Sequence, residues 1–320
     1  MAIIAGIDEA GYGPILGPLT VSGVAFRVPD DQAEGCLWER LQSSVTRSAS
    51  RRDRRLPIID SKKLYSRQAG LDGLERTSLT ALRVSGHNPA SLRDLLQVVS
   101  PDAPAQLDEY PWYCDFDVGL PLAVDAARIA TQANALGRDC RNHGIDIAGF
   151  SCEPLLEGHF NRLVSRTRNK GVVLLGLVLR IVDRFMKLAD GRPLHIFVDR
   201  QGGRARYATH LMTAFEGCDL QIVEESADRS AYVLRRANAD VRIAFVVSGE
   251  DKHLPIALAS ILSKYLRELL MMGLNRYWQA HVPGLRPTAG YYTDGHRFLK
   301  DIAAAVQRTG VDRSLLVRSR

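Results

Sequence analysis

The chain has 320 residues, of which 46% are hydrophobic and 24% are charged, and these ordinary globular values exclude a collagen-like, fibrous or wholly disordered protein. An excess of 42 Lys and Arg over 36 Asp and Glu leaves a formal charge of +6, which permits a polyanionic partner without requiring one. No apolar run is long enough for a membrane helix, and the N-terminus lacks the basic start and apolar stretch of a signal peptide. We therefore expect a soluble cytoplasmic protein.

The length predicts either one large domain with insertions or two modest domains. Five cysteines are scattered along the chain without any CxxC pair. An odd count without paired spacing predicts neither a disulfide framework nor a zinc cage. We expect buried free thiols.

The N-terminal part begins with a predicted β-hairpin. Residues 3–8 and 20–26 are short β-rich runs, joined by GYGPILGP. Residues 43–55 are polar and contain five arginines, which predicts a flexible surface loop that is either simply solvated or in contact with phosphate. Prolines at 89, 101, 104, 111 and 121 interrupt the next stretch, so we expect residues 75–121 to form an irregular, loop-rich insertion.

The remainder of the chain alternates predicted helices and strands. The hydrophobic periodicity predicts helices over 122–142, 171–189, 205–215, 228–238 and 255–273, and strands over 145–151, 194–199, 220–226 and 241–248. The last helix starts with Pro255 at a permitted early position and is expected to end at Gly273. Alternating strands and helices after a hairpin predict a mixed α/β architecture.

Acidic residues stand at the ends of two predicted strands. Asp8 and Glu9 end the first strand, and Asp199 ends a second, apolar one. Glu268 lies one turn after Lys264 on the same face of the last helix. Each acid alone is compatible with a solvated terminus or a wet helix face. Four converging carboxylates would instead raise one another's pKa values and form an oxygen-only site suited to Mg²⁺ or Mn²⁺.

Five segments carry motifs that occur in one order along the chain. They are 6–14 (GIDEAGYGP) followed by Gly17-Pro18, 60–64 (DSKKL), 197–199 (FVD), 259–264 (ASILSK), and 290–293 (GYYT) with His296. Together they resemble the motifs of type 2 ribonucleases H. The resemblance covers about half of the chain, and five ordered motifs are far more specific than any one of them.

The resemblance implies a ribonuclease H-like α/β fold with a mixed central sheet flanked by helices. It also implies a single catalytic domain over 1–320, with insertions near 75–144 and 204–245 and a C-terminal helical portion at about 255–320. The implied activity is endonucleolytic hydrolysis of the RNA strand in RNA/DNA hybrids, which leaves 5′-phosphate and 3′-hydroxyl ends. Two divalent ions, Mg²⁺ or Mn²⁺, would support this in-line reaction.

The family's functional residues map onto this sequence one by one. Its four metal-binding acids fall on Asp8, Glu9, Asp199 and Glu268. The implied substrate-binding residues are Gly11, Tyr12, Gly13, Ser61, Lys62, Lys63 and Tyr291. Among them, the two glycines would approach the ribose 2′-hydroxyl through their backbones, and the tyrosine at 291 would pack at the ribonucleotide junction.

Two positions depart from the family pattern. Glu268 stands where the family has aspartate, and the interval before it contains Glu224, Glu225 and Asp228 as alternative fourth ligands. Tyr12 replaces the family's arginine, so recognition of a single ribonucleotide embedded in DNA is less secure than cleavage of a hybrid.

Three alternative functions stand beside the hybrid endonuclease. The first is a catalytically impaired nucleic-acid-binding protein of the same fold, and the second is a ribonuclease H-like DNA endonuclease. The third is a metal-dependent phosphatase, whose motifs are absent from the sequence. The expected partner is an RNA/DNA hybrid or ribonucleotide-containing DNA, with no membrane and no obligate protein partner.

Overall fold

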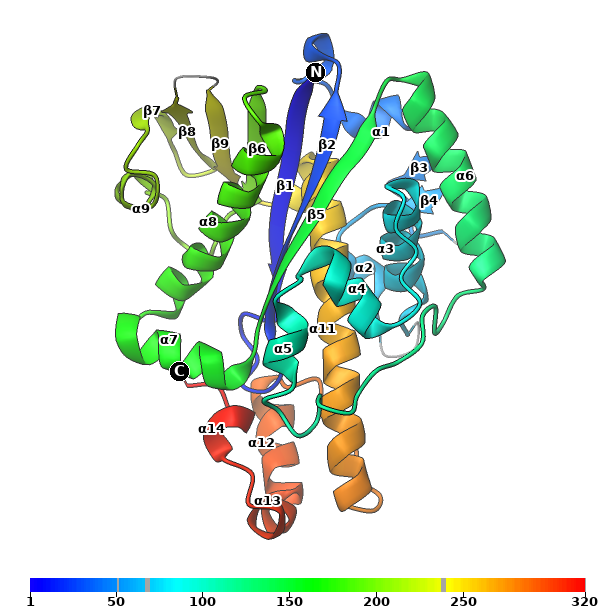
Figure 1. The fold of residues 1–320 in the computed structure, drawn as a ribbon, viewed down its shortest axis with the longest axis vertical. Coiled ribbons are helices and arrows are strands. Elements are labelled where there is room, and N and C mark those ends of the chain that lie inside the picture. Colours follow the sequence, from blue (N-terminus) through cyan, green and yellow to red (C-terminus); the bar gives the residue numbers. More distant parts are fainter. Residues whose placement is uncertain (51, 67–69, 237–239, 320) are drawn as a thin grey trace.

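The computed structural model describes residues 1–50, 52–66, 70–236 and 240–319. Its strands are β1 Ala2–Ala10, β2 Leu19–Val28, β3 Val45–Thr46, β4 Leu56–Pro57, β5 Asp146–Leu155, β6 Leu194–Asp199, β7 Asp219–Glu225, β8 Arg229–Arg235 and β9 Val241–Val246. Seven of them form one sheet in the order β5-β2-β1-β6-β9-β8-β7, and β3 and β4 form a small separate sheet (Figure 1).

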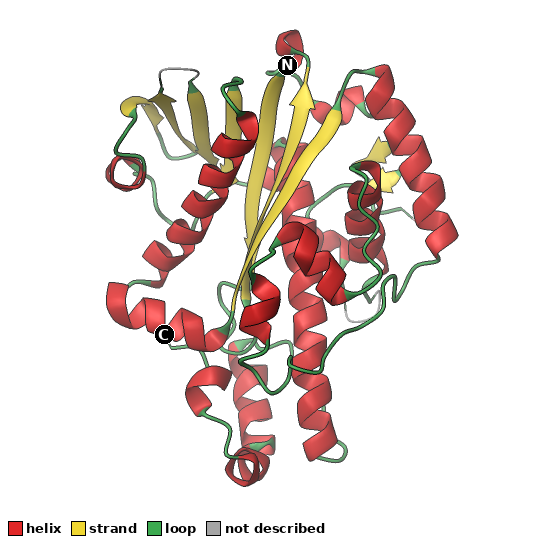
Figure 2. Cartoon of the chain, in the orientation of Figure 1, coloured by secondary structure: helices red, strands yellow, loops and turns green. Residues whose placement is uncertain are grey.

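The large sheet is mixed. Strands β5, β2 and β1 are antiparallel neighbours, β1, β6 and β9 run parallel, and β8 and β7 complete the sheet as an antiparallel pair. Helices cover both of its faces (Figure 2). The predicted α/β class with a mixed central sheet flanked by helices is therefore confirmed.

The helices are α1 Leu37–Arg40, α2 Ser61–Leu64, α3 Asp72–Val84, α4 Leu92–Val99, α5 Ala103–Leu107, α6 Ala126–Asn142, α7 Glu157–Thr167, α8 Lys170–Ala189, α9 Ala208–Ala214, α10 Gly249–Lys252, α11 Leu254–His281, α12 Tyr292–Asp301, α13 Ala303–Thr309 and α14 Arg313–Leu316. A short 3-10 helix covers Asp30–Gln32. None of the helices in the described ranges combines the length and apolar character needed to cross a membrane.

The side chains of strand β1 alternate between the two faces of the sheet, and both faces are covered by apolar clusters. Ile3, Ala5 and Ile7 belong to the apolar cluster that contains α8. Ala2 and Ile4 belong to the cluster that contains α11. By the same alternation the side chain at position 8 projects towards α11 and its neighbour at position 9 towards the opposite face.

The parallel register aligns the ends of three strands at one edge of the sheet. Ile7 of β1 pairs with Val198 of β6, so the acids that follow each of them reach the edge together. Val246 at the end of β9 pairs with Asp199. Side chains at the carboxyl ends of neighbouring parallel strands converge, which is where α/β sheets place their ligand sites.

Most predicted elements are present, but the expectation of a loop-rich segment over 75–121 holds only for 108–121 and the turns between helices. This segment forms most of α3, all of α4 and all of α5. In α4 the apolar residues Leu92, Leu95, Leu96 and Val99 are buried on one face, and Ser91 caps the helix. The prolines lie between these short helices or in a first turn, where they are tolerated.

Three further expectations need correction. The predicted helix over 228–238 is strand β8 from Arg229 to Arg235. It pairs with β7 and β9 and buries Tyr232 and Leu234 in the apolar cluster that contains α8, and 237–238 lie outside the described residues. Helix α11 continues past Gly273 to His281. A Cβ on that glycine would lie 2.8 Å from the Phe116 ring, so the residue serves close packing within the helix rather than its end.

The 43–55 segment, expected to be a loop, includes β3 with its buried Val45, whereas residue 51 lies outside the described residues. All five cysteines are free, as predicted. Cys140 and Cys152 are buried, whereas Cys114 is exposed, so the expectation of burial holds for only part of the set.

Candidate active site

Three predicted acids meet at the carboxyl ends of β1 and β6. Asp8, only 8% exposed, accepts a hydrogen bond from the Glu9 backbone N–H at 2.7 Å. Asp199 accepts one from the Gly249 N–H at 2.8 Å. All three carboxylates line a cavity of about 570 Å³, which we call the acidic cavity. The structure thus brings together acids that are 190 residues apart in the sequence.

A fourth acid, Glu250, lines the same cavity and was missed by the sequence analysis. Ser248 adopts a left-handed backbone with φ of 52°, which turns the chain from β9 into α10. This turn places the Gly249 N–H on Asp199 and the Glu250 carboxylate beside it. The available signal was an acid shortly after a third buried strand, the same pattern that marked the other strand ends.

The carboxylates of the acidic cavity raise one another's pKa values. Burial and the charge of Asp199 raise the pKa of Glu9 to about 7. Burial raises the pKa of Asp199 to about 6, and the charge of Glu250 and a hydrogen bond with it act in the same direction, against the hydrogen bond from the Gly249 N–H. Burial and the charges of Glu9 and Asp199 also raise the pKa of Asp8, against a hydrogen bond with Ser260. The cavity therefore holds more negative charge than its own surroundings stabilise.

The DSKKL segment forms α2 and brings a lysine to these acids. Asp60 caps the helix by accepting from the Lys62 backbone N–H at 2.9 Å. Ser61 and Ser260 share a hydrogen bond of 3.1 Å, which ties α2 to α11. Burial alone would lower the pKa of Lys62, but the carboxylates around it, Asp60 and the cavity acids, raise it. Lys62 is thus a firmly protonated cation within the acidic cavity.

Glu268 lies outside the acidic cavity. Its carboxylate binds Lys264 Nζ and accepts from Tyr65 Oη at 2.7 Å, and Arg267 Nη1 lies 3.6 Å away. The side chain is only 10% exposed. Lys264 and Tyr65 both line the cavity, so Glu268 is linked to it through these two partners. The role of Glu268 as a metal ligand stays a prediction, and Glu250 is the fourth acid that the cavity itself contains.

The other acids considered as a fourth ligand lie elsewhere. Glu224, on the edge strand β7, accepts from the Ser226 hydroxyl, and Glu225 accepts from the Tyr232 hydroxyl. Neither of them, nor Asp228, lines the acidic cavity.

The loop after β1 contributes Gly11 and Tyr12 to the acidic cavity. Gly11 has φ of 88°, and a Cβ there would lie 2.4 Å from Arg267 Nε, so backbone and packing both require glycine. Tyr12 lies beneath the ammonium of Lys170, 5.0 Å from its ring centre. Gly13 is exposed and lies outside the cavity. The substrate roles predicted for these residues are not tested by these positions.

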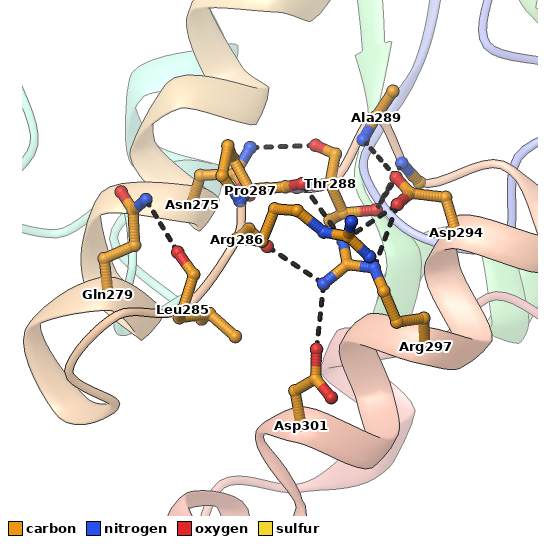
Figure 3. Close-up of polar contacts among 11 residues, drawn as sticks. Asn275, Gln279, Leu285, Arg286, Pro287, Thr288, Ala289, Asp294, Arg297 and Asp301 are labelled. Carbon is orange, nitrogen blue, oxygen red and sulfur yellow. Dashed lines mark hydrogen bonds and ion pairs between the residues drawn. The ribbon is translucent and has the colours of Figure 1, made fainter.

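A hydrogen-bond network fixes the segment before Tyr291 (Figure 3). Asn275 of α11 binds both the N–H and the carbonyl of Thr288, at 2.8 and 2.9 Å. Asp294 accepts from the Thr288 hydroxyl at 2.7 Å and the Ala289 N–H at 2.9 Å. Arg297 holds Asp294 from the other side at 2.8 Å. The network anchors this loop to α11 and α12.

Gly290 connects that network to the loop after β1. Its backbone has φ of 81°, and its carbonyl accepts from the Ile15 N–H at 2.8 Å. Tyr291 follows, lines the acidic cavity and is 53% exposed. Arg267 lies 5.9 Å from its ring centre. A rigidly held backbone thus presents an accessible aromatic ring at the rim of the cavity.

The acidic cavity has the donor chemistry of a divalent-cation site. Among the described residues, no three His, Cys, Asp or Glu side chains form a ready-made metal cage. The acidic donors are nevertheless all oxygens, and Glu250 Oε2 is buried with no hydrogen-bond partner in the described parts of the chain. Four carboxylates face two lysines, one of which is already paired with Glu268. Such a donor set fits Mg²⁺ or Mn²⁺.

Comparison with known proteins finds similarity in structure. No family model matches the chain, and no curated protein matches it in sequence. It is similar to the ribonuclease HII of Archaeoglobus fulgidus solved with PCNA, at 16% identity and a TM-score of 0.44, over 99% of this chain and 94% of that one.

Two other solved structures are similar to it. Bst-RNase HIII in complex with Mn²⁺ gives 15% identity and a TM-score of 0.47, over 99% of this chain and 66% of that one. The ribonuclease H2 of Pyrococcus horikoshii OT3 gives 12% identity and a TM-score of 0.42, over 98% and 92%. At such identities the functional assignment rests on the residues of the site.

Proposed function

We propose that this protein is a divalent-metal-dependent endonuclease of the ribonuclease H type, which hydrolyses the RNA strand of RNA/DNA hybrids. The observation that carries the proposal is the convergence of Asp8, Glu9 and Asp199 in one cavity with Lys62 and the exposed ring of Tyr291. The five ordered motifs and the formal charge of +6 support it. A nucleic acid is the substrate class that needs both a carboxylate site for metal and an adjacent cationic rim.

The residues of the acidic cavity divide into metal-holding and substrate-holding groups. Asp8, Glu9, Asp199 and Glu250 would hold Mg²⁺ or Mn²⁺, which when bound stabilises charge on the scissile phosphate and provides the nucleophile. Ser260 orients the Asp8 carboxylate through their hydrogen bond. This bond restricts the carboxylate before a ligand binds.

The substrate side is formed by a cation and an aromatic ring. Lys62 lies among carboxylates that raise its pKa and keep it charged, so a phosphate oxygen that enters the cavity meets a cation already in place. Tyr291 offers a ring face at the rim, on which a base or sugar can pack without sequence preference. Together these groups place a nucleic-acid backbone over the acids.

The test is a substrate panel with matched variants. The full-length protein is incubated with a labelled RNA/DNA hybrid, with duplex DNA that contains one ribonucleotide, and with duplex DNA that contains none, each in Mg²⁺ or Mn²⁺. We expect cleavage of the RNA strand by the native protein and by Glu224→Gln, an acid on the distant edge strand. Asp8→Asn should abolish cleavage while the circular dichroism spectrum is unchanged.

Each other outcome identifies a different function. Turnover retained by Asp8→Asn would refute the assignment of the site. Salt-sensitive binding without cleavage would identify a nucleic-acid-binding protein that has lost catalysis. Cleavage of strands that contain no ribose would identify a DNA endonuclease.

A further inference from the structure

A second polar cavity, of about 520 Å³, lies beside α2 and carries more positive than negative charge. Lys63 of α2, Arg76 of α3 and Arg128 of α6 line it together with Asp72. Arg128 is paired with Asp72 at 3.7 Å, and both side chains are half-exposed. One acid thus faces three bases. We call this the basic cavity.

Arg76 is the feature of the basic cavity that calls for a ligand. Its side chain is only 9% exposed, and its Nε is buried with no hydrogen-bond partner in the described parts of the chain. Burial and the nearby Arg128 charge lower the pKa of Arg76, against the charge of Asp72, because both disfavour the cation. A buried guanidinium is normally paired, since its removal from water is otherwise uncompensated. Its planar fork of donors matches two oxygens of a phosphate.

The basic cavity adjoins the acidic cavity through consecutive residues. Lys62 lines the acidic cavity and Lys63 lines the basic one. Asp251, next to the acid at 250, binds Lys63 at 3.4 Å, and both of these side chains are more than half exposed. A polyanion that occupies one cavity therefore lies next to the other. Arg76 and Arg128 both belong to the 75–144 segment, which none of the five motifs covers.

We propose that the basic cavity binds a backbone phosphate of the same nucleic acid whose scissile phosphate lies in the acidic cavity, with Arg76 as its principal ligand. This proposal rests on the proposed function and assigns the 75–144 segment a part in holding the substrate. Arg128 and Lys63 add charge at the entrance. Asp72 pairs with Arg128 and Asp251 pairs with Lys63, so the net positive charge of the site comes from Arg76 and suits a single phosphodiester.

The first experiment measures binding without catalysis. Native protein, Arg76→Gln, Arg128→Gln and Arg83→Gln bind a fluorescent RNA/DNA hybrid in EDTA at several salt concentrations, followed by anisotropy. Arg83 lies on the same helix, is exposed and binds Asn88, so it is a matched loss of one charge outside the cavity. We expect Arg76→Gln and Arg128→Gln to weaken binding by about tenfold and to lower the salt slope by about 1. Arg83→Gln should bind like the native protein.

The second experiment separates the phosphate site from the nuclease. Thermal unfolding of the same proteins is followed in a phosphate-free buffer with and without inorganic phosphate. We expect phosphate to stabilise the native protein and Arg83→Gln but not the two cavity variants. If the circular dichroism spectrum shows that Arg76→Gln does not fold, hybrid binding and phosphate-dependent unfolding are compared between native protein and Arg128→Gln, which changes a half-exposed residue.

The outcomes distinguish the two proposals. If the native protein cleaves hybrids but both cavity variants bind them like Arg83→Gln, the phosphate site is refuted and the nuclease stands. If the native protein neither binds nor cleaves nucleic acid, the proposed function fails and the backbone-phosphate site fails with it. Phosphate-dependent stabilisation that requires Arg76 would in that case identify a site for free phosphate.

Discussion

Substitution of Gly290 by alanine tests whether one backbone contact positions the cavity rim. A Cβ at this residue would lie 2.2 Å from the carbonyl oxygen of Leu16. A carbon and a carbonyl oxygen in contact normally lie about 3.3 Å apart, so the two backbones must separate by about 1 Å. The left-handed backbone at φ of 81° itself costs alanine about 1 to 2 kcal/mol.

The displacement has a functional and a structural consequence. It breaks the hydrogen bonds that the Ile15 and Leu16 N–H groups donate to the Gly290 carbonyl, at 2.8 and 3.2 Å. It also moves Tyr291 and the loop that carries Gly11. A shift of about 1 Å among substrate-positioning groups costs about 100-fold in rate, so we expect kcat/KM for hybrid cleavage to fall by that amount.

Gly284→Ala is the matched control. This residue also has a left-handed backbone, with φ of 74°, but no atom lies within 4 Å of the position its Cβ would take. It should lose about 1 to 2 kcal/mol of unfolding free energy and keep its activity. Urea unfolding and steady-state cleavage of a hybrid measure the two effects. Equal losses of activity and stability in both variants would refute the argument that contact with Leu16 sets the rim.

Three further predictions concern other parts of the chain. Glu250→Gln should weaken Mn²⁺ binding in calorimetry by at least about tenfold, whereas Glu268→Gln should retain it but lose about 3 kcal/mol of stability, because Lys264 is left without its partner. Glu75, which is fully buried, accepts from three successive backbone N–H groups at residues 122–124, so Glu75→Ala should lose at least about 3 kcal/mol in urea unfolding. Burial, with the charges of Arg229 and Lys252, lowers the pKa of His253 from 6.5 to about 4. The unfolded chain therefore binds more protons than the folded one between these pH values, and the native protein loses stability on acidification. In His253→Phe the loss of unfolding free energy from pH 6.5 to 4 should be about 3 kcal/mol smaller.

The contradicting results are specific to each of these variants. Loss of Mn²⁺ binding in Glu268→Gln but not in Glu250→Gln would show that the fourth metal ligand is Glu268, as the motif predicts. Unchanged stability of Glu75→Ala would mean that the 122–124 segment is held by its apolar contacts alone. An acid-unfolding profile unchanged in His253→Phe would show that the histidine, stacked on Phe197 at 3.8 Å, remains hydrated enough to protonate freely.

Several features of the protein follow from the sequence alone, because they depend on local pattern. The β-rich run 3–8 and the apolar strand pattern of 194–199 predict strands, and each places an acid at its end. The amphipathic runs of α6 and α8 are long enough for their period to identify helices.

Only the tertiary structure shows the short elements and the presence of Glu250 in the acidic cavity. Helices such as α4 and α5 are too short to be stable by themselves and form because neighbouring elements bury their apolar faces. The β8 segment, with mixed character, takes the strand conformation that pairing with β7 and β9 requires.

The choice between Glu250 and Glu268 could not be made from spacing. Both acids lie near suitable elements, but only the parallel register of β1, β6 and β9 shows which strand ends share an edge. The ion pair with Lys264 removes Glu268 from the cavity, and a left-handed turn at Ser248 brings Glu250 into it. Sequence specifies which residues carry charge, whereas the distances between charges from remote segments are set only when the sheet is assembled.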